Sequence, residues 1–510
     1  MKLAVVCLSC AVLLGGAAYG QSAKTPAGFE VADVHVSPIV RNPYMRGPLH
    51  RAGRYEIRQA TIVDLVSTAY GVEREKVLGG VCLNRGCIPS KALLYATHQI
   101  VNARESAHRG IEFTEPKVEL EKLRHWKNTI LQKLSGGVAT LAKMRGVQVI
   151  QGRGYFEGSQ KLRVETDQGQ QFVEYDKAIL AVGSVPKMPK AFDLGNPRIM
   201  TSTEALELPD VPESLLIVGG GYIGMELGFV YAALGSKVVV VEALDNILAG
   251  ADQDLARPVV ANAKKMFKEI RLKAKVSKMA TVGKQIKVAM EYNGQKLEEL
   301  YDRVLVAVGR APNGADLGLE NTKIQRDEGG YVKINTQQQT DDPNIYAIGD
   351  IAGGIMLAHK AHKEARIAVD AIYGGKIAFD SVIPAVVFTD PELAWCGLTE
   401  TEAKEKGIPY EVAKFPWSAS GRALSFDRTD GVTKILGDPN TNRVLGVGIC
   451  GAGAGELIAE AVLAIEMGAT VEDIAETIHP HPTLSETLME CADAFYGHAT
   501  HTYTKKKAAE

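Results

Sequence analysis

The chain has 510 residues, of which 46% are hydrophobic and 51 are glycine, and its formal net charge is −2. This composition fits a globular α/β protein of three or four domains and excludes a disordered or fibrous chain. The balanced charge, without a basic block, gives no electrostatic reason to expect a nucleic-acid partner. Seven cysteines are too few for a secreted scaffold held by disulfides.

Residues 1–20 have the pattern of a signal peptide. Lys2 precedes an apolar run from Leu3 to Ala18, and Ala18-Tyr19-Gly20 offers a cleavage site with small residues. The run is too short for a transmembrane helix, and no later segment is long and apolar enough to span a membrane. The alternative is a buried first strand with a Gly-rich turn, but such a turn must open a helix and the sequence after Gly20 is polar and broken. We therefore predict an exported or periplasmic protein.

Residues 21–78 have mixed patterns. They predict a strand over residues 29–34, a loop over residues 38–51, a strand over residues 54–58 and a helix over residues 61–70.

Cys82 and Cys87 are separated by four residues and are followed by Pro89 and helix-forming sequence. A close pair with these neighbours suits a reversible disulfide. A helix starting near Pro89 would direct backbone N–H groups at Cys87 and favour its thiolate. The spacing alone leaves two inert cysteines as an equal alternative. Three further cysteines stand singly and are predicted to be buried thiols: Cys396, Cys450 and Cys491.

The stretch from Gly79 to Lys91 resembles the redox-active segment of the pyridine nucleotide–disulfide oxidoreductases, most closely the branch that oxidises protein-bound dihydrolipoamide. The resemblance covers residues 78–500 and implies that Cys82 and Cys87 form the redox disulfide. In this family a strand, a GxGxxG turn and a helix that bind the ADP half of FAD precede the cysteines. Nothing between Gly20 and Leu78 supplies that unit, so weakened FAD binding is expected.

The resemblance implies an α/β fold with Rossmann-like FAD and NAD domains, the FAD domain incomplete at its N-terminus, and an α+β C-terminal dimerisation domain. The expected organisation is a signal peptide (1–20), an unrelated segment (21–78), a partial FAD domain with the redox disulfide (79–209), an NAD-binding domain (210–312), a return to the FAD domain (313–380) and the dimerisation domain (381–510).

A glycine-rich motif starts at Gly219, follows the apolar strand 214–218, opens a helix and precedes a strand that ends at Glu242. A strand, a helix and an acidic residue in this order predict a dinucleotide site, and a turn without a ligand is the alternative. The helix N-terminus stabilises the pyrophosphate. Glu242 should bind the adenosine ribose and repel a 2′-phosphate, which favours NAD over NADP. The residues assigned to NAD are Gly219, Gly220, Gly221, Tyr222, Ile223, Gly224, Glu226, Glu242, Val276 and Gly309.

A near-repeat, residues 178–184 and 304–310, brackets this domain, and each copy predicts a buried strand ending where the chain crosses between domains. By resemblance, Asp350 hydrogen-bonds the ribityl chain of FAD, and Lys91 and Glu226 form an ion pair beside the flavin ring. The residues assigned to FAD are Lys91, Gly154, Gly183, Ser184, Asp350, Met356, Leu357, Ala358 and His359.

His481 is followed by Pro-Thr-Leu-Ser and Glu486, which matches the segment that carries the general base of the family. The resemblance implies that His481 is the base and that Glu486 orients it and balances its charge. His479 is the competing base. In the family this domain forms a homodimer, and the base serves the cysteines of the partner subunit.

The resemblance implies that His481 deprotonates a dihydrolipoyl thiol, that the thiolate attacks Cys82, and that electrons then pass through FAD to NAD. The expected partner is a lipoylated protein of a 2-oxoacid dehydrogenase or glycine cleavage complex. Such partners are cytoplasmic, so the cytoplasm is the alternative location. Glu242 disfavours glutathione and mercuric reductases, and the lack of a C-terminal cysteine pair also disfavours the latter. The second hypothesis about function is that the chain is not an enzyme. It would then be a non-catalytic exported fusion, or a misassembled gene product, that retains only nicotinamide binding.

Overall fold

The computed structural model describes residues 3–7, 31–35, 46–51, 54–58 and 78–503. The chain forms two compact units. The first comprises Met1–Pro89, Glu121–Pro186 and Arg310–Asp380, and the second comprises Ser90–Leu120, Lys187–Gly309 and Ser381–Glu510. The chain crosses between units after Pro186 and after Gly309, close to the end of each copy of the near-repeat. Among the described residues, no helix combines the length and the apolar character needed to cross a membrane.

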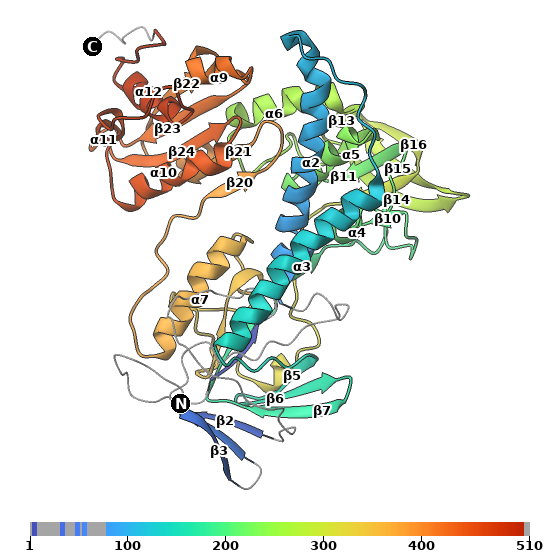
Figure 1. Ribbon diagram of the computed structural model, residues 1–510, viewed down its shortest axis with the longest axis vertical. Coiled ribbons are helices and arrows are strands. Elements are labelled where there is room, and N and C mark those ends of the chain that lie inside the picture. Colours follow the sequence, from blue (N-terminus) through green and yellow to red (C-terminus); the bar gives the residue numbers. More distant parts are fainter. Residues whose placement is uncertain (1–2, 8–30, 36–45, 52–53, 59–77, 504–510) are drawn as a thin grey trace. The chain divides into compact units, whose positions relative to one another are not determined.

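The first unit is built on a parallel sheet with the strand order β1-β8-β19. It also contains the antiparallel sheet β5-β6-β7, which is labelled in Figure 1. The central strand β8 of the parallel sheet has buried side chains from Ala178 to Ala181, as expected for a parallel strand covered on both faces. Ile179 packs in a cluster with α7, whereas Leu180 packs in a cluster with the antiparallel sheet β5-β6-β7. The elements are β1 (Leu3–Cys7), β8 (Lys177–Ala181), β19 (Ile345–Ala347), α7 (Ala358–Ile372), β5 (Arg153–Gly158), β6 (Lys161–Thr166), β7 (Gly169–Glu174), β9 (Ser184–Pro186), β18 (Arg310–Pro312), α1 (Gly80–Arg85), η2 (Leu319–Asn321) and η3 (Gly349–Ala352).

The N-terminal strand β1 lies within the predicted signal peptide. It pairs in parallel with β8, from Leu3 opposite Lys177 to Cys7 opposite Ala181. The structure therefore has a strand at residues 3–7, and the Gly-rich turn that the alternative places after it lies outside the described residues.

A small sheet with the order β2-β4-β3 precedes the cysteines. Its strands are β2 (Val31–His35), β3 (Arg46–Arg51) and β4 (Arg54–Arg58). The two predicted strands are present, but the predicted loop over residues 38–51 is wrong at its end, where β3 forms. Pro48 is tolerated because β3 is an edge strand with a register shift between Arg46 and Leu49. The predicted helix over residues 61–70 lies outside the described residues.

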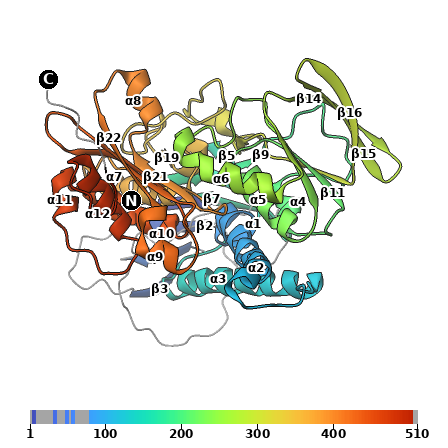
Figure 2. The ribbon, with the colours of Figure 1, turned by 90° about the horizontal axis from the view of Figure 1, so that it is seen from above.

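In the second unit, residues 187–309 form a parallel sheet with the order β10-β17-β11-β12-β13, and α5 contacts β11 and β12. The antiparallel sheet β14-β15-β16 of the same residues is seen in Figure 2. The predicted strands 214–218 and 236–242 correspond to β11 and β12. The elements are β10 (Ile199–Met200), α4 (Ser202–Leu206), β11 (Ser214–Val218), α5 (Tyr222–Ala233), β12 (Lys237–Val241), α6 (Gln253–Met266), β13 (Glu269–Arg271), β14 (Lys275–Val282), β15 (Gln285–Tyr292), β16 (Gln295–Tyr301) and β17 (Arg303–Val306).

Residues 381–503 form an antiparallel sheet with the order β20-β21-β24-β23-β22, on which α10 and α12 pack. Cys396, Cys450 and Cys491 are buried, which confirms the prediction for these thiols. The elements are β20 (Ala385–Val387), β21 (Leu393–Gly397), α8 (Glu400–Lys406), β22 (Glu411–Pro416), η4 (Trp417–Ala419), α9 (Gly421–Ser425), β23 (Val432–Gly437), β24 (Val444–Cys450), α10 (Ala454–Glu466), α11 (Val471–Ala475) and α12 (Glu486–Phe495). Two long helices, α2 (Cys87–Glu105) and α3 (Leu120–Met144), and the short η1 (Ser106–Arg109) complete the described chain.

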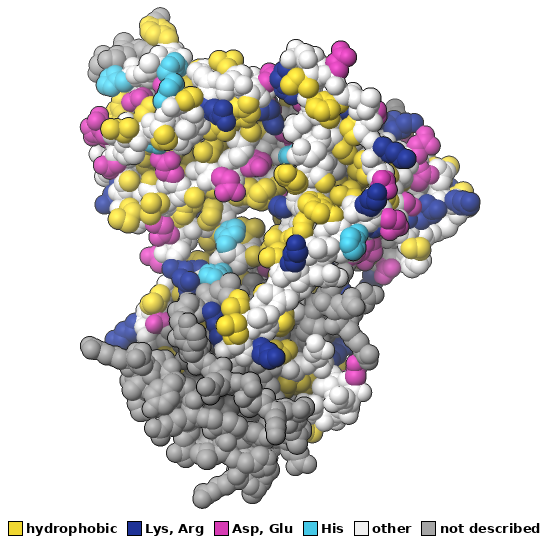
Figure 3. Space-filling view, in the orientation of Figure 1, with side chains coloured by type: hydrophobic (Ala, Val, Ile, Leu, Met, Phe, Trp, Pro, Cys, Tyr) yellow, Lys and Arg dark blue, Asp and Glu magenta, His cyan; other side chains and the backbone are white. Residues whose placement is uncertain are grey.

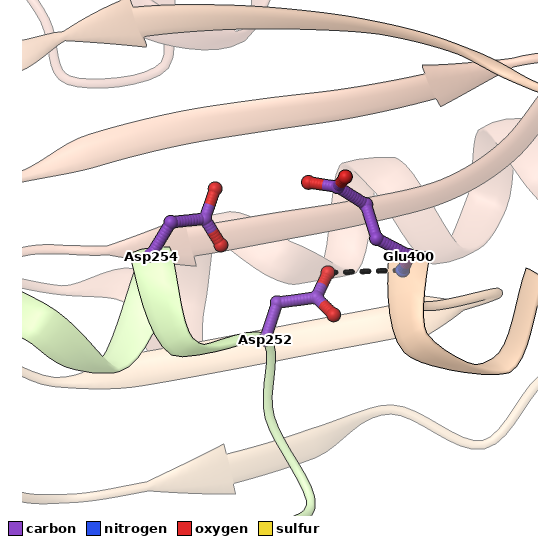
Figure 4. A group of neighbouring side chains, drawn as sticks. All are labelled: Asp252, Asp254 and Glu400. Carbon is purple, nitrogen blue, oxygen red and sulfur yellow. Dashed lines mark hydrogen bonds between the residues drawn. The ribbon is translucent and has the colours of Figure 1, made fainter. Parts of the chain in front are cut away.

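A buried ion cluster joins α6 to the C-terminal sheet. The carboxylates of Asp252, Asp254 and Glu400 converge and have the ligand types of a metal site (Figure 4). Lys434 Nζ, however, lies 2.6, 2.8 and 2.9 Å from one oxygen of each, and this side chain is only 1% exposed. The ammonium group therefore supplies the positive charge among the three carboxylates, and we assign an ion-pair cluster rather than a metal site.

We expect Lys434→Met to lower the free energy of unfolding by about 3–5 kcal/mol, because it removes the cation from the buried Asp252 carboxylate. Urea unfolding followed by circular dichroism measures this. Lys414→Met is the matched control: Lys414 contacts Asp254 and Glu400 but is 44% exposed, so the expected loss is below about 1 kcal/mol. Equal losses in the two variants would contradict this assignment.

The pKa of Asp252 predicts how the stability difference between wild type and Lys434→Met depends on pH. Burial acts to raise the pKa of this carboxyl, but hydrogen bonds from Lys434 and the backbone outweigh burial and hold the pKa below its usual value. A lowered pKa in the folded state adds stability that is lost as the pH falls. The stability difference between wild type and Lys434→Met should therefore shrink as the pH falls below about 4, the ordinary pKa of an aspartate.

Candidate active site

The two cysteines of the predicted redox pair form a disulfide. Cys82 lies in α1 and is half-buried, whereas Cys87 is the exposed first residue of α2, and their Cα atoms are 4.6 Å apart. The Asn84 side chain donates hydrogen bonds to the carbonyls of Leu78 and Gly80, which fixes the preceding turn. Because α2 begins two residues before Pro89, its N-terminal N–H groups lie at Cys87, where they favour a thiolate.

Lys91 and Glu226 form an ion pair, with Lys91 Nζ 3.0 and 2.8 Å from the two carboxylate oxygens. The Glu226 side chain is 5% exposed and accepts two further hydrogen bonds, from the Ser90 hydroxyl at 2.7 Å and the Phe388 backbone N–H at 3.0 Å. Lys91 Nζ also lies 4.3 Å from the centre of the Phe388 ring. The sequence analysis identified the ion pair but missed the contributions of Ser90 and Phe388.

The glycine-rich turn lies between β11 and the N-terminus of α5. Gly219 has φ 110°, and a Cβ atom there would lie 2.4 Å from the Ala307 carbonyl oxygen, so this position requires glycine. Gly221 caps α5 without a side-chain hydrogen bond, which leaves the first N–H groups of the helix available to a phosphate. Glu242 accepts hydrogen bonds from the backbone N–H groups of Gly220 and Leu244 at 2.7 and 2.8 Å.

The other residues assigned to NAD differ in their surroundings. Gly224 is buried, and a Cβ atom there would lie 2.0 Å from the Gly219 carbonyl oxygen, so the glycine permits close packing of the helix on the strand. Tyr222 and Gly309 are exposed, and Ile223 is half-buried. Val276 lies in β14 with its side chain in the apolar core, so a contact with nucleotide at this position would involve backbone atoms.

Ser184 and Asp350, both assigned to FAD, form a hydrogen bond in which the hydroxyl donates to the carboxylate. Arg310, which the sequence analysis placed in the near-repeat without a role, donates to Ser184 Oγ at 2.6 Å and to the Ser184 carbonyl at 2.7 Å. Pairing of β9 with β18 brings Arg310 to Ser184. The Gly349 N–H donates to Glu364 Oε2 at 2.7 Å and fixes the turn before Asp350.

The remaining residues assigned to FAD line the same unit. Met356 and Leu357 precede α7, and Ala358 and His359 begin it. The Leu357 cap makes no side-chain hydrogen bond, so the first N–H groups of α7 are available to an acceptor. Gly183 follows β8, and Gly154 lies in β5 opposite Val164. This set of polar groups and helix N-terminus fits the ribityl and ring portions of FAD.

The two histidines of the C-terminal segment have different surroundings. His481 Nδ1 lies 2.8 Å from Glu486 Oε1, its side chain is 74% exposed, and its Nε2 has no hydrogen-bond partner among the described residues. His479 is only 4% exposed, and Glu460 and Thr477 occupy its two nitrogens. The geometry therefore leaves His481, not His479, with a nitrogen available for proton transfer.

Glu486 lies at the start of α12 and has a pKa below its ordinary value. Burial acts to raise this pKa, but hydrogen bonds from the Thr483 N–H and from His481 outweigh it. An ionised Glu486 orients the imidazole and balances its charge when the ring takes a proton.

Comparison with known proteins gives matches along most of the chain. A profile of the pyridine nucleotide-disulphide oxidoreductases matches residues 56–365, and a profile of their dimerisation domain matches residues 383–492. Since the first match begins at residue 56, the expected start of the resemblance at Leu78 was too late. The dihydrolipoyl dehydrogenase of Vibrio parahaemolyticus is 47% identical over 437 residues, which cover 85% of this chain and 92% of the relative. That of Haemophilus influenzae is 46% identical, with coverages of 84% and 90%.

Solved structures give the same fold. The HOCl-induced flavoprotein disulfide reductase RclA from Escherichia coli has a TM-score of 0.74 and 28% identity, covering 84% of this chain and 94% of that chain. LpdA from Mycobacterium tuberculosis has a TM-score of 0.76 and 26% identity, with coverages of 84% and 93%.

The described cysteines should separate into two reactivity classes. After mild reduction, we expect iodoacetamide to modify the peptides that carry Cys82 and Cys87 well before those with buried thiols, because burial raises the pKa of Cys396 to about 12 and also raises the pKa of Cys450 and Cys491. Mass spectrometry of the digested protein gives the order of labelling. Early modification of a buried thiol in the folded protein would contradict it.

Proposed function

The chain belongs to the pyridine nucleotide–disulfide oxidoreductase family, and from this premise we propose that it is a dihydrolipoyl dehydrogenase. In this role it oxidises dihydrolipoamide on a lipoylated protein of a 2-oxoacid dehydrogenase or glycine cleavage complex and reduces NAD. The observation that carries the proposal is the Cys82–Cys87 disulfide at the exposed N-terminus of α2. The His481–Glu486 pair supplies the base that a thiol substrate requires.

The residues of the chain account for the thiol half of the reaction. His481 Nε2 takes the proton of one dihydrolipoyl thiol, and the resulting thiolate attacks Cys82 Sγ. The Cys82–Cys87 bond breaks, and the N-terminus of α2 stabilises the Cys87 thiolate that leaves. The second dihydrolipoyl sulfur attacks the mixed disulfide and closes the lipoyl ring, and its proton passes to the Cys82 thiolate that is released. FAD, when bound, supplies the two-electron link between this dithiol and nicotinamide.

We expect purified protein to show the visible bands of oxidised flavin and to reduce NAD with dihydrolipoamide. The kcat/KM with NAD should exceed that with NADP by about 10-fold or more, since the Glu242 carboxylate repels a 2′-phosphate. Absorbance spectra and steady-state rates with both nucleotides measure this. A colourless protein that binds NADH but lacks activity, even after addition of FAD, would instead support the non-catalytic fusion.

We propose that the protein functions as a homodimer. The match of residues 383–492 to the dimerisation domain supports this. Apolar side chains lie among acidic and basic ones on the face of the C-terminal domain seen in Figure 3. Four large apolar residues of the matched range are well exposed: Leu424, Leu463, Met467 and Ile478. Ile478 is 94% exposed and lies next to the base segment, so association there would bury apolar surface beside His481.

We expect Ile478→Asp to shift the protein from dimer to monomer, because burial of a carboxylate opposes association. Sedimentation velocity measures the shift, and activity with dihydrolipoamide should fall in parallel. Val282→Asp, at an exposed apolar position of β14, is the matched control and should leave the dimer intact. A fully dimeric Ile478→Asp protein would exclude this surface from the interface.

For location, we propose export, supported by the signal-peptide pattern of residues 1–20. The cytoplasmic alternative is supported by the use of residues 3–7 as strand β1 and by the expected lipoylated partners. N-terminal sequencing of the protein from separated cell fractions distinguishes them: an intact N-terminus in the cytoplasm would overturn the export proposal.

A further inference from the structure

The segment that carries His481 connects α11 to α12 and is held at both ends. At its C-terminal end, Glu486 Oε2 accepts a hydrogen bond from the Thr483 N–H at 2.7 Å, and Thr483 Oγ1 donates to the Pro480 carbonyl at 2.7 Å. At its N-terminal end, Thr477 Oγ1 donates to the Asp473 carbonyl at 2.7 Å. These contacts secure residues next to the base but do not tie the segment to the neighbouring helix α10.

His479 makes that connection. Its Nε2 lies 2.7 Å from Glu460 Oε1 on α10, and its Nδ1 lies 2.8 Å from the Thr477 carbonyl oxygen. A neutral imidazole has one N–H, whereas here both nitrogens face oxygen acceptors. The two contacts hold the ring between α10 and the segment that precedes His481. The 4% exposure of the ring limits its replacement by water.

We propose that His479 and Glu460 form a brace that positions His481 for proton transfer. This inference rests on the proposed dihydrolipoyl dehydrogenase function. His479 is a positioning residue, since its nitrogens are occupied and only His481 offers an unpaired Nε2. Only Pro480 separates the two histidines, so a shift of the His479 backbone reaches the base almost undiminished. Misplacement of a reacting group by 1 Å costs on the order of 100-fold in rate.

The first experiment compares His479→Gln and Glu460→Gln with wild type. Both variants should lower kcat with dihydrolipoamide by about 10-fold or more and change KM little, because the base is misplaced while the binding surface is retained. NADH oxidation by ferricyanide should stay within about twofold of wild type, since this reaction has no dihydrolipoyl thiol to deprotonate. The double variant should be no slower than the slower single variant, because the two residues act as one pair.

The control is His108→Gln, which removes an exposed histidine–carboxylate pair with Asp427 in the same unit. It should leave both activities unchanged. If ferricyanide reduction falls as much as dihydrolipoamide oxidation in the brace variants, the pair has only a general structural role. Unchanged kcat in both single variants would also overturn the proposal.

Hydrogen exchange gives a second readout that does not depend on activity. The peptide spanning residues 477–485 should exchange faster in Glu460→Gln than in wild type, because the segment is released from α10. Glu460 is 38% exposed, so this substitution leaves folding intact even where His479→Gln does not. Exchange in Glu460→Gln at the wild-type rate would overturn the brace. Faster exchange in Glu460→Gln, together with a wild-type protein that is itself inactive towards dihydrolipoamide, would overturn only the proposed function.

Discussion

The buried carboxylate of Glu226 connects three parts of the second unit. It lies on α5, which opens at the nicotinamide turn, and it accepts hydrogen bonds from Ser90 and Lys91 on α2 and from the Phe388 backbone, directly after β20 of the C-terminal sheet. A buried carboxylate requires such compensation, because an unpaired charge there costs several kcal/mol. The requirement fixes α2, which starts at the redox cysteine, against the helix that receives the dinucleotide. The packing of residues 90–105 of α2 against α5 thus depends on an electrostatic constraint as well as on apolar contacts.

The two histidines near the C-terminus show how surroundings assign different roles to the same side chain. His479 is enclosed with both nitrogens occupied, whereas His481 has one nitrogen on a carboxylate and the other unpaired. A base needs an available nitrogen and a partner that stabilises its protonated form. His479 has no available nitrogen, and its buried side chain is not accessible to a substrate thiol. It can act on the reaction only through the backbone of its neighbour.

The local parts of the site were predictable from the sequence. The nicotinamide turn is encoded by glycines between an apolar strand and a helix, and the His481–Glu486 spacing places His481 shortly before α12 and Glu486 at its start. Long-range partners were not predictable in the same way. Glu460 is a surface-type residue on an amphipathic helix, and nothing in its neighbours indicates contact with a histidine 19 positions later. Arg310 is similar, because its pairing with Ser184 depends on two strands more than a hundred residues apart.

The N-terminus presents a different problem, since one apolar run satisfies two patterns. Five residues of the run pair in parallel with β8, whereas removal of a signal peptide after Gly20 would take this strand away. Processing and the three-stranded sheet β1-β8-β19 are therefore mutually exclusive in one molecule. Without β1, the backbone N–H and C=O groups of β8 on that side lose their partners, and a strand edge of the flavin domain becomes exposed. The fate of the N-terminus thus determines whether β8 of the flavin domain stays paired with β1 on this side or becomes an edge strand.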